Sequence, residues 1–183
     1  MKVFVVWFLV LVGCSLEEAE PLPLLPPLAT NPVRVSTWSR GSFECSGVII
    51  HKDWVLTAAH CGASRMWVEN RKVTFASQPN PQWDMLLLQV PGLPGTDVTW
   101  AYPKPRVGDP AVLVGWGCSD GHTKAKLSLA YAESVDDRDI TYTEPICGGD
   151  SGGPAFDFDG RLIGLIVRKV ASNDHAVVQY LAE

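Results

Sequence analysis

Residues 144–156 read EPICGGDSGGPAF, and the chemistry of the chain centres on this stretch. Its one hydroxyl, on Ser151, stands beside Asp150 and among glycines. Glycine permits backbone angles and close approaches that a side chain would forbid, so a serine placed there can stand clear of the surface. Neighbouring N–H groups can then point at one spot, which suits acyl transfer because an oxyanion forms beside the nucleophile. An ordinary glycine-rich turn would have the same composition, so the rest of the chain must decide between the two interpretations.

Length and composition fit a single globular domain of ordinary size. The chain has 183 residues, of which 46% are hydrophobic and 19% charged, so it can bury a core. The 15 basic and 20 acidic residues give a formal net charge of −5, which offers no electrostatic reason to expect a nucleic-acid partner. The 16 glycines and 14 prolines indicate many turns and favour an all-β fold.

The amino terminus has the pattern of an export signal. Lys2 precedes the apolar run VFVVWFLVLV, and one positive charge followed by about ten apolar residues is typical of a signal peptide, here residues 1–13. The run is too short to span a bilayer as a helix. The box LVGC at residues 11–14 resembles a bacterial lipoprotein signal, in which the cysteine is diacylated, so Cys14 is a candidate lipid anchor. The alternative is a plain secretory signal in which Cys14 is incidental.

A tether separates Cys14 from the folded part of the chain. Residues 15–32 read SLEEAEPLPLLPPLATNP, and a segment that is acidic at its start and rich in proline predicts an extended spacer. We therefore expect residues 14–32 to be the tether and residues 33–183 the folded domain. Because two acyl chains anchor a protein stably, we expect attachment to the membrane of a bacterial cell envelope, on its periplasmic or cell-surface side. Without lipidation the protein would be secreted.

From residue 33 onward, short apolar or alternating runs are separated by turns. The runs contain about four to eight residues and are rich in Val, Ile and Leu, which predicts β-strands. They are residues 46–50, 54–57, 72–75, 85–90, 111–114, 126–130, 162–167 and 176–181. Many short strands with Gly- and Pro-rich turns predict an all-β barrel or sandwich.

His60 follows one of these strands and stands next to a cysteine. A strand, a turn and a second strand would bring Cys45 and Cys61 together, and a disulfide there would fix the loop that carries His60. Histidine titrates near neutrality, which makes it the natural base to take the proton of a serine. A lone histidine beside a cysteine is also common as a structural residue or a metal ligand. No second histidine lies at ligand spacing, so we expect no metal site.

Asp84 opens the apolar run DMLLLQV. A carboxylate at the head of an otherwise buried strand is costly unless a partner compensates for its burial. A histidine N–H would serve, and the carboxylate would in turn fix the tautomer of the ring and stabilise its cationic form. Taken alone, Asp84 would more often be a turn residue.

Three short motifs follow one another along the chain: TAAHC at residues 57–61, DMLLL at 84–88 and GDSGGP at 149–154. In the order His, Asp, Ser they resemble the trypsin/chymotrypsin-like serine protease family. The resemblance covers residues 41–167 and includes GWG at 115–117, a landmark of the family. It implies two six-stranded antiparallel β-barrels with the site in the cleft between them, a protein or peptide substrate and no cofactor.

The resemblance also implies a role for each motif. His60 would be the general base and later the acid, Asp84 would orient it, and Ser151 would be the nucleophile. The backbone N–H groups of Gly149 and Ser151 would form the oxyanion hole. His60 and Asp84 are 24 positions apart, a shorter stretch than usual, and this compactness resembles the bacterial branch of the family. We therefore expect trimmed loops and no long carboxy-terminal helix.

Asp150 needs a partner that differs from the one in the digestive branch of the family. There, a new amino terminus formed by cleavage pairs with the aspartate next to the nucleophile, but no Ile-Val-Gly-Gly follows a basic residue near the start of this domain. A buried, unpaired carboxylate would be expensive, so we expect a basic side chain to pair with Asp150. Activation by cleavage is then not expected, and cleavage after Arg34 or Arg40 is the alternative.

The second disulfide and the substrate pocket also depart from the family. Cys147 stands where the family has a cysteine that pairs with one beyond the nucleophile, but no cysteine follows Ser151. In the family the segment after GWG passes close to the loop before the nucleophile, so the resemblance implies Cys118 as the partner. Pro145 occupies the position where trypsin-like enzymes place an aspartate to bind Lys or Arg, so we expect a different specificity. In the strand that pairs with substrate, Val167 replaces a usual serine, and Lys169 near the pocket wall could narrow the pocket or favour an acidic residue.

Two hypotheses for the function follow. The leading one is an active, monomeric serine endopeptidase. The rival is a binding module on the same fold, with an intact triad but a pocket closed by Lys169 or a disordered oxyanion loop. Most family members that lose activity also lose a triad residue, and all three are present in this chain, which favours the enzyme.

Overall fold

The computed structural model describes residues 32–38, 42–62, 64–95, 97–118 and 124–181. The predicted signal peptide (residues 1–13), Cys14 and the tether as far as residue 31 lie outside this part of the chain. The described residues form β-strands and turns with one short 3₁₀ turn, η1 (Ala59–Cys61), so the predicted all-β class is confirmed. Within these ranges no helix is long and apolar enough to cross a membrane.

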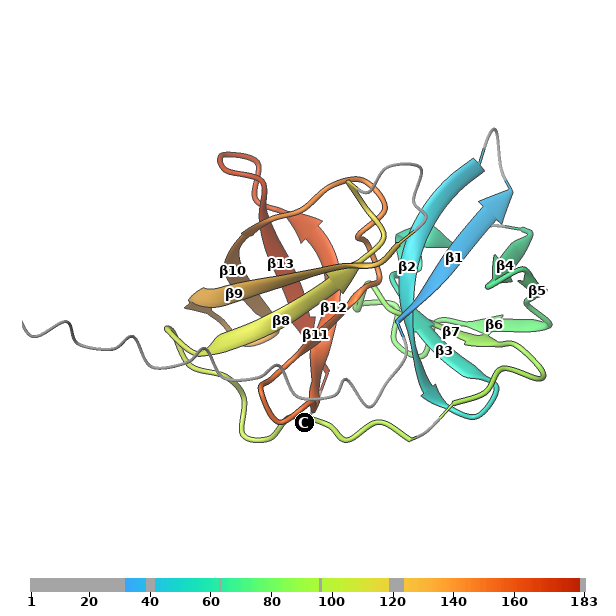
Figure 1. Ribbon diagram of the computed structural model, residues 1–183, viewed down its shortest axis with the longest axis horizontal. Coiled ribbons are helices and arrows are strands. Elements are labelled where there is room, and N and C mark those ends of the chain that lie inside the picture. Colours follow the sequence, from blue (N-terminus) through green and yellow to red (C-terminus); the bar gives the residue numbers. More distant parts are fainter. Residues whose placement is uncertain (1–31, 39–41, 63, 96, 119–123, 182–183) are drawn as a thin grey trace, which may run out of the picture.

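The strands form two antiparallel bodies that lie side by side (Figure 1). The amino-terminal body contains β1 (Pro32–Trp38), β2 (Ser42–His51), β3 (Trp54–Thr57), β4 (Met66–Val68), β5 (Arg71–Lys72), β6 (Phe75–Ser77) and β7 (Leu86–Gln89). The carboxy-terminal body contains β8 (Pro110–Gly115), β9 (Lys126–Val135), β10 (Asp139–Pro145), β11 (Pro154–Phe156), β12 (Leu162–Lys169) and β13 (His175–Tyr180).

The amino-terminal body is a curled sheet with the strand order β5-β4-β1-β2-β3-β7-β6 (Figure 1). Its two outer strands are neighbours in the chain, because only Val73 and Thr74 separate β5 from β6. One continuous segment therefore pairs with β4 through its first half and with β7 through its second half. This body is a half-barrel of seven strands, one more than expected, because the segment that links its two edges is interrupted between β5 and β6. Together with the closed barrel of the carboxy-terminal body it agrees with the predicted pair of antiparallel barrels.

The carboxy-terminal body is a closed six-stranded barrel with the order β10-β13-β12-β11-β8-β9. Strand β8 illustrates why its sequence is continuously apolar. Ala111 and Leu113 belong to the cluster inside the barrel, whereas Val112 and Val114 belong to a second cluster that includes Val48 of the amino-terminal body. Successive side chains of a strand point to opposite faces, and here both faces are buried.

The second of these clusters joins the two bodies. It contains residues of β2, β3, β8, β11, β12 and β13, namely Val48, Leu56, Val112, Val114, Phe156, Leu162, Leu165, Val167 and Val177. Each is at most 4% exposed, so the contact between the bodies is packed like a core and fixes where the loops of one body meet those of the other.

Candidate active site

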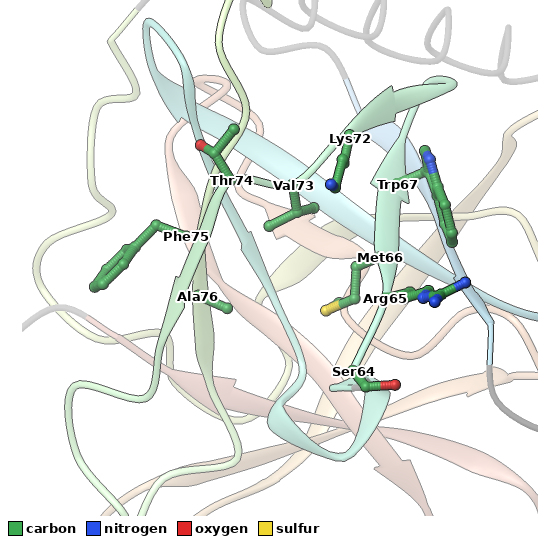
Figure 2. A pocket seen from close by; sticks show the side chains of 9 residues that line it. All are labelled: Ser64, Arg65, Met66, Trp67, Lys72, Val73, Thr74, Phe75 and Ala76. Atoms are coloured by element: carbon green, nitrogen blue, oxygen red, sulfur yellow. The ribbon is translucent and has the colours of Figure 1, made fainter.

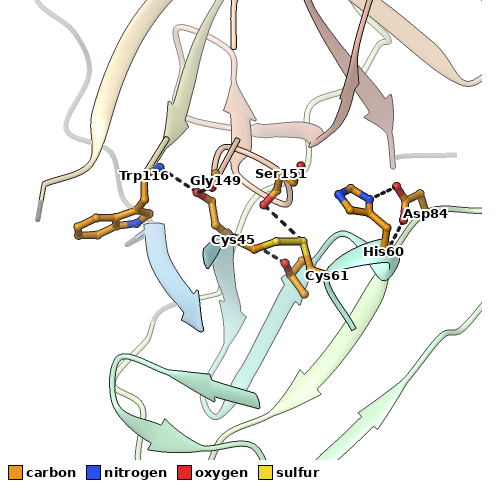
Figure 3. The surroundings of a disulfide bond; sticks show 9 residues. Cys45, His60, Cys61, Asp84, Trp116, Gly149 and Ser151 are labelled. Carbon is orange, nitrogen blue, oxygen red and sulfur yellow. Dashed lines mark hydrogen bonds and ion pairs between the residues drawn. A yellow bond between two sulfur atoms is a disulfide. The ribbon is translucent and has the colours of Figure 1, made fainter. Parts of the chain in front are cut away.

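Local pairing in the amino-terminal sheet brings His60 and Asp84 together. His60 is carried by η1, directly after β3, and Asp84 lies two residues before β7. Because Thr57 pairs with Leu86 in the ladder between β3 and β7, the turn after one strand faces the segment before the other. The result is a two-point contact: His60 Nδ1 lies 2.6 Å from Asp84 Oδ2, and the His60 backbone N–H donates to Asp84 Oδ1 at 2.8 Å (Figure 3).

This contact defines how the imidazole can act. The side chains of His60 and Asp84 are 41% and 33% exposed, so the pair lies at the surface of the amino-terminal body. An ionised carboxylate can only accept hydrogen bonds, so Nδ1 must carry the proton of the neutral ring. Nε2 of His60 is then the nitrogen available to accept a proton.

A disulfide supports the turn that carries His60. Cys45 of β2 and Cys61 of η1 are bonded, with their Cα atoms 6.3 Å apart, and both residues are buried (Figure 3). This is the pairing that the strand–turn–strand pattern predicts. The disulfide ties the turn of His60 to β2. The same strand also reaches the loop of Ser151, because Ser46, which follows Cys45, donates its backbone N–H to Ser151 O.

Ser151 lies in a loop of residues 147–153, which we call the oxyanion loop. Gly149 and Gly152 have φ angles of 103° and 81°, in the left-handed region that favours glycine. A Cβ on Gly152 would also lie 2.8 Å from Ala58 N and overlap the Thr57 side chain, so this position has no room for a side chain.

In the view of Figure 3, the ring of His60 stands between Asp84 and Ser151. The Ser151 hydroxyl makes no hydrogen bond to another described residue, and such bonds commonly tighten only when substrate binds.

Asp150 is held in a way that the sequence did not predict. It is 3% exposed, and its carboxylate accepts hydrogen bonds from the backbone N–H groups of Gly117 at 2.7 Å and Cys147 at 2.9 Å. Among the described residues no basic side chain forms an ion pair with it, and the carboxylate is held by backbone amides where the sequence predicts a basic side chain. Glycine at positions 115 and 117 makes the arrangement possible, since a Cβ on Gly117 would lie 2.7 Å from the carboxylate carbon.

The disulfide between Cys118 and Cys147 joins the segments that supply these two amides. The Cα atoms of the two cysteines are 5.5 Å apart, and Gly117 and Cys147 donate to opposite oxygens of Asp150. The bond therefore closes a ring of covalent and hydrogen bonds around the carboxylate. This is the pairing that the resemblance to the serine protease family implies.

Ser46 is a residue of the site that sequence reasoning missed. It is fully buried in β2, and its hydroxyl donates to Gly149 O at 2.8 Å and accepts from the Trp116 backbone N–H at 2.9 Å. Its own backbone N–H donates to Ser151 O at 2.8 Å. The only signal in the sequence is a polar residue inside the apolar strand CSGVII.

The three residues predicted for the substrate pocket lie in different environments. Pro145 is exposed at the end of β10, Val167 is 4% exposed in the cluster between the two bodies, and the Lys169 ammonium lies 2.7 Å from Asp174 Oδ1. Pro145 borders a cavity of ≈ 10 Å³ beside Asp150, and among the described residues its lining includes neither Val167 nor Lys169. Of the three residues, this cavity therefore contains only Pro145.

A larger hollow lies on the amino-terminal sheet, where β5 gives way to β6 (Figure 2). Its volume is ≈ 550 Å³, and it is lined by Ser64, Arg65, Met66, Trp67, Lys72, Val73, Thr74, Phe75 and Ala76. None of the predicted catalytic residues lines it, so it is separate from the candidate site. Among the described residues no group of three or more His, Cys, Asp or Glu is placed to hold a metal ion.

Comparisons with known proteins agree with this geometry. The trypsin family model matches residues 28–180. Kallikrein-1E2 of Equus caballus is 30% identical over 129 residues, which are 57% of this chain and 49% of that protein. The serine protease Rv3671c of Mycobacterium tuberculosis is 29% identical over 140 residues, 67% of this chain and 35% of that protein. The chain thus spans about half the length of the first relative and about a third of the second.

Solved structures show the same fold. The active form of the Rv3671c protease from M. tuberculosis superposes with a TM-score of 0.72 at 20% identity, covering 90% of this chain and 88% of that one. That likeness concerns the fold, which agrees with a closed barrel beside a curled sheet. Because the family model covers most of the chain and includes all three motifs, the chain belongs to the trypsin family.

Proposed function

We propose that the chain is a serine endopeptidase that cleaves peptide bonds in proteins or peptides with Ser151, His60 and Asp84. The observation that carries this proposal is the two-point contact between Asp84 and His60, at 2.6 and 2.8 Å. A carboxylate that holds both Nδ1 and the backbone N–H of one histidine fixes the ring and its tautomer and leaves Nε2 as the base. Membership of the trypsin family supports the same chemistry.

In the first half-reaction, the Ser151 hydroxyl attacks the carbonyl carbon of the scissile bond. Nε2 of His60 takes the hydroxyl proton, and the carboxylate of Asp84 stabilises the imidazolium that forms. The carbonyl oxygen becomes an oxyanion that accepts hydrogen bonds from the N–H groups of Gly149 and Ser151. The intermediate then collapses, the C–N bond breaks, and His60 donates its proton to the leaving amine.

In the second half-reaction, water hydrolyses the acyl-enzyme. Nε2 of His60 accepts a proton from water as its oxygen attacks the ester carbonyl, and the same oxyanion donors act again. Collapse breaks the bond to Ser151 Oγ, which regains its proton from His60. The carboxylic acid product leaves, and the enzyme returns to its starting state.

The proposed substrate preference rests on Pro145 and Lys169. We infer that the residue before the scissile bond is neither Lys nor Arg, because Pro145 supplies no carboxylate for a cation. Lys169 is already paired with Asp174, so an acidic substrate residue would have to compete with that carboxylate. Cleavage rates of matched peptides with Glu, Ala, Phe or Arg at this position test the inference, and a strong preference for Arg would overturn it.

We also propose that the protein is a monomer that is exported and held at a bacterial membrane through a diacylated Cys14. The support is the signal-like residues 1–13 followed by the LVGC box. In cells fed an alkyne fatty acid, the wild-type chain should carry the label and sediment with membranes. Cys14→Ser should lose both properties, and a variant that still sediments would argue against a lipid anchor at this residue.

The first test of activity is labelling of the full-length protein with a fluorophosphonate probe. Labelling requires an assembled nucleophile, base and oxyanion hole, so the wild type should react and Ser151→Ala should not. A folded protein with both disulfides that does not label would favour the binding module. Trimming after Arg34 or Arg40 before a second labelling would then identify a precursor that needs cleavage.

A further inference from the structure

Ser46 connects the two bodies through the oxyanion loop. It belongs to β2 of the amino-terminal body, yet its side-chain oxygen bridges two segments of the carboxy-terminal body. The hydroxyl donates to Gly149 O at 2.8 Å and accepts from the Trp116 N–H at 2.9 Å. The residue is 0% exposed, so loss of its hydroxyl would take a hydrogen-bond donor from the buried Gly149 carbonyl and an acceptor from the Trp116 N–H.

The contacts of Ser46 flank the two donors of the proposed oxyanion hole. Its hydroxyl holds the carbonyl of Gly149, and its backbone N–H holds the carbonyl of Ser151 at 2.8 Å. The donors are the N–H groups of these same two residues. Gly149 has a φ of 103° and no side chain, so its own conformational preferences restrain it little. The Gly149 carbonyl belongs to the peptide group between residues 149 and 150, which lies between the two peptide groups that carry the donor N–H groups. A hydrogen bond to this carbonyl therefore restrains the middle peptide group and limits how its two neighbours can rotate.

Ser46 is itself anchored on the amino-terminal side. Its carbonyl accepts a hydrogen bond from the Thr57 hydroxyl at 2.7 Å, and Thr57 is also fully buried. The preceding residue, Cys45, is bonded to Cys61, next to His60. One two-residue stretch of β2 thus links the turn of the base to the loop of the nucleophile.

We propose that Ser46 is a positioning residue for the oxyanion hole. It aligns the N–H groups of Gly149 and Ser151 by holding the carbonyls of both residues, and it does so from the opposite body. The inference rests on the proposed peptidase function. It means that the hole reaches its working geometry only when the amino-terminal sheet is docked on the barrel.

The test is Ser46→Ala in the full-length protein, with Thr143→Val as the matched control. The Thr143 hydroxyl also accepts from a backbone amide, that of Tyr131 at 3.0 Å, and among the described residues it makes no hydrogen bond to the oxyanion loop. Deleting a direct oxyanion donor costs about 10²–10³ in kcat, so loss of alignment alone should cost roughly tenfold or more. We expect that fall in kcat for Ser46→Ala, with KM nearly constant, and no fall for Thr143→Val. A kcat within about twofold of wild type would overturn the proposal.

Ser46→Gly separates positioning from stability. It deletes the methylene as well as the hydroxyl, which leaves space where one water can bridge Trp116 N–H and Gly149 O. Glycine in a strand is less stable than alanine, so stability should follow the order Ser, Ala, Gly. Activity should instead follow Ser, Gly, Ala. A kcat that follows the stability order would mean that Ser46 acts only through folding.

A readout that does not need activity distinguishes failure of this inference from failure of the proposed function. The amides of Asp150 and Gly153 are bonded within the oxyanion loop, to Cys147 O and Asp150 O. Hydrogen exchange at these amides should be at least about tenfold faster in Ser46→Ala than in wild type or Thr143→Val. Equal exchange would overturn the positioning role. An inactive wild type with this exchange pattern would instead reject the peptidase and keep the role of Ser46 in ordering the loop.

Discussion

The two bodies of the molecule hold their parts of the candidate site in different ways. The amino-terminal sheet supplies His60 and Asp84, which are 41% and 33% exposed and joined by two hydrogen bonds. The carboxy-terminal barrel supplies Ser151 beside Asp150, which is 3% exposed and surrounded by backbone amides and a disulfide. We therefore expect that side chains of the site on the amino-terminal sheet can be replaced with little effect on folding. On the carboxy-terminal barrel, a change that affects catalysis should also affect stability.

Asp84→Asn should give the largest effect and confine it to activity. The amide cannot both hold the protonated Nδ1 of His60 and stabilise its cationic ring, so kcat should fall by about 10⁴. Because the Asp84 side chain is a third exposed, unfolding free energy should change by less than about 1 kcal/mol. Peptide hydrolysis and urea unfolding of the same preparation measure the two quantities. A loss of stability as large as several kcal/mol would show that this half, too, is part of the folding core.

Gly152→Ala should damage the buried half and lower both stability and activity. Its φ of 81° strains any other residue, and the added Cβ would lie 2.8 Å from Ala58 N. We expect a loss of about 3–4 kcal/mol in unfolding free energy, measured by urea denaturation, together with loss of probe labelling.

Gly108→Ala is the control for the backbone conformation. Gly108 has a φ of 90°, but a Cβ there meets nothing within 4 Å, so only the conformational cost of about 1 kcal/mol should remain. If the two glycine variants lose equal stability, crowding of position 152 against the amino-terminal body does not contribute, and the oxyanion loop is not coupled to that body through this contact.

The two disulfides allow a direct comparison of the bodies, because removal of either one is expected to lower the free energy of unfolding by a similar amount. Cys45 and Cys61 are 16 positions apart, and Cys118 and Cys147 are 29 apart. Restriction of the unfolded chain predicts a loss of about 3 kcal/mol for replacing either pair with alanine, slightly more for the longer loop. Thermal or urea unfolding of the two double variants tests this. A much larger loss for the pair in the carboxy-terminal barrel would mean that the ring around Asp150 contributes beyond chain entropy.

Sequence reasoning succeeded where the chemistry is local. The all-β class follows from short apolar runs and turns, and the contact between His60 and Asp84 joins two residues that short motifs mark. It failed where contacts join distant segments. Ser46 bonds to residues 70 and 103 positions away, and Asp150 accepts from an amide 33 positions away. Such contacts depend on how the two bodies dock and on which backbone groups they leave open, and neither is encoded in a local pattern.

The break between β5 and β6 was missed for a related reason. The run at residues 72–75 was predicted as one strand, but the chain changes partner from β4 to β7 around Val73 and Thr74. The Val73 N–H donates to Met66 O of β4 at 3.0 Å and the Thr74 N–H to Gln89 O of β7 at 2.9 Å, so consecutive amides bond to two different strands of the sheet. Hydrophobic pattern alone does not specify which neighbour a strand pairs with.

Lys126→Met should give the smallest effect, and it is visible only through pH. Burial by itself would raise the pKa of the Glu144 carboxyl, but hydrogen bonds from Lys126 and Ser128 more than offset this and hold the pKa below its ordinary value of 4.5. A group with a lowered folded-state pKa adds stability above its unfolded pKa, and that stability is lost as pH falls through the folded pKa. The ion pair is partly exposed, with Lys126 37% accessible, so the contribution should not exceed about 1 kcal/mol.

Urea unfolding at a series of pH values below 5 measures this contribution, with Lys52→Met as the control for loss of one positive charge at an exposed turn. In wild type and Lys52→Met, stability should fall as Glu144 becomes protonated. In Lys126→Met the fall should be smaller, because without the ammonium the burial of Glu144 dominates and its pKa rises. If both variants show the same pH dependence, the Lys126–Glu144 pair is only a surface contact. The carboxy-terminal barrel would then owe its rigidity to backbone contacts like those of Asp150.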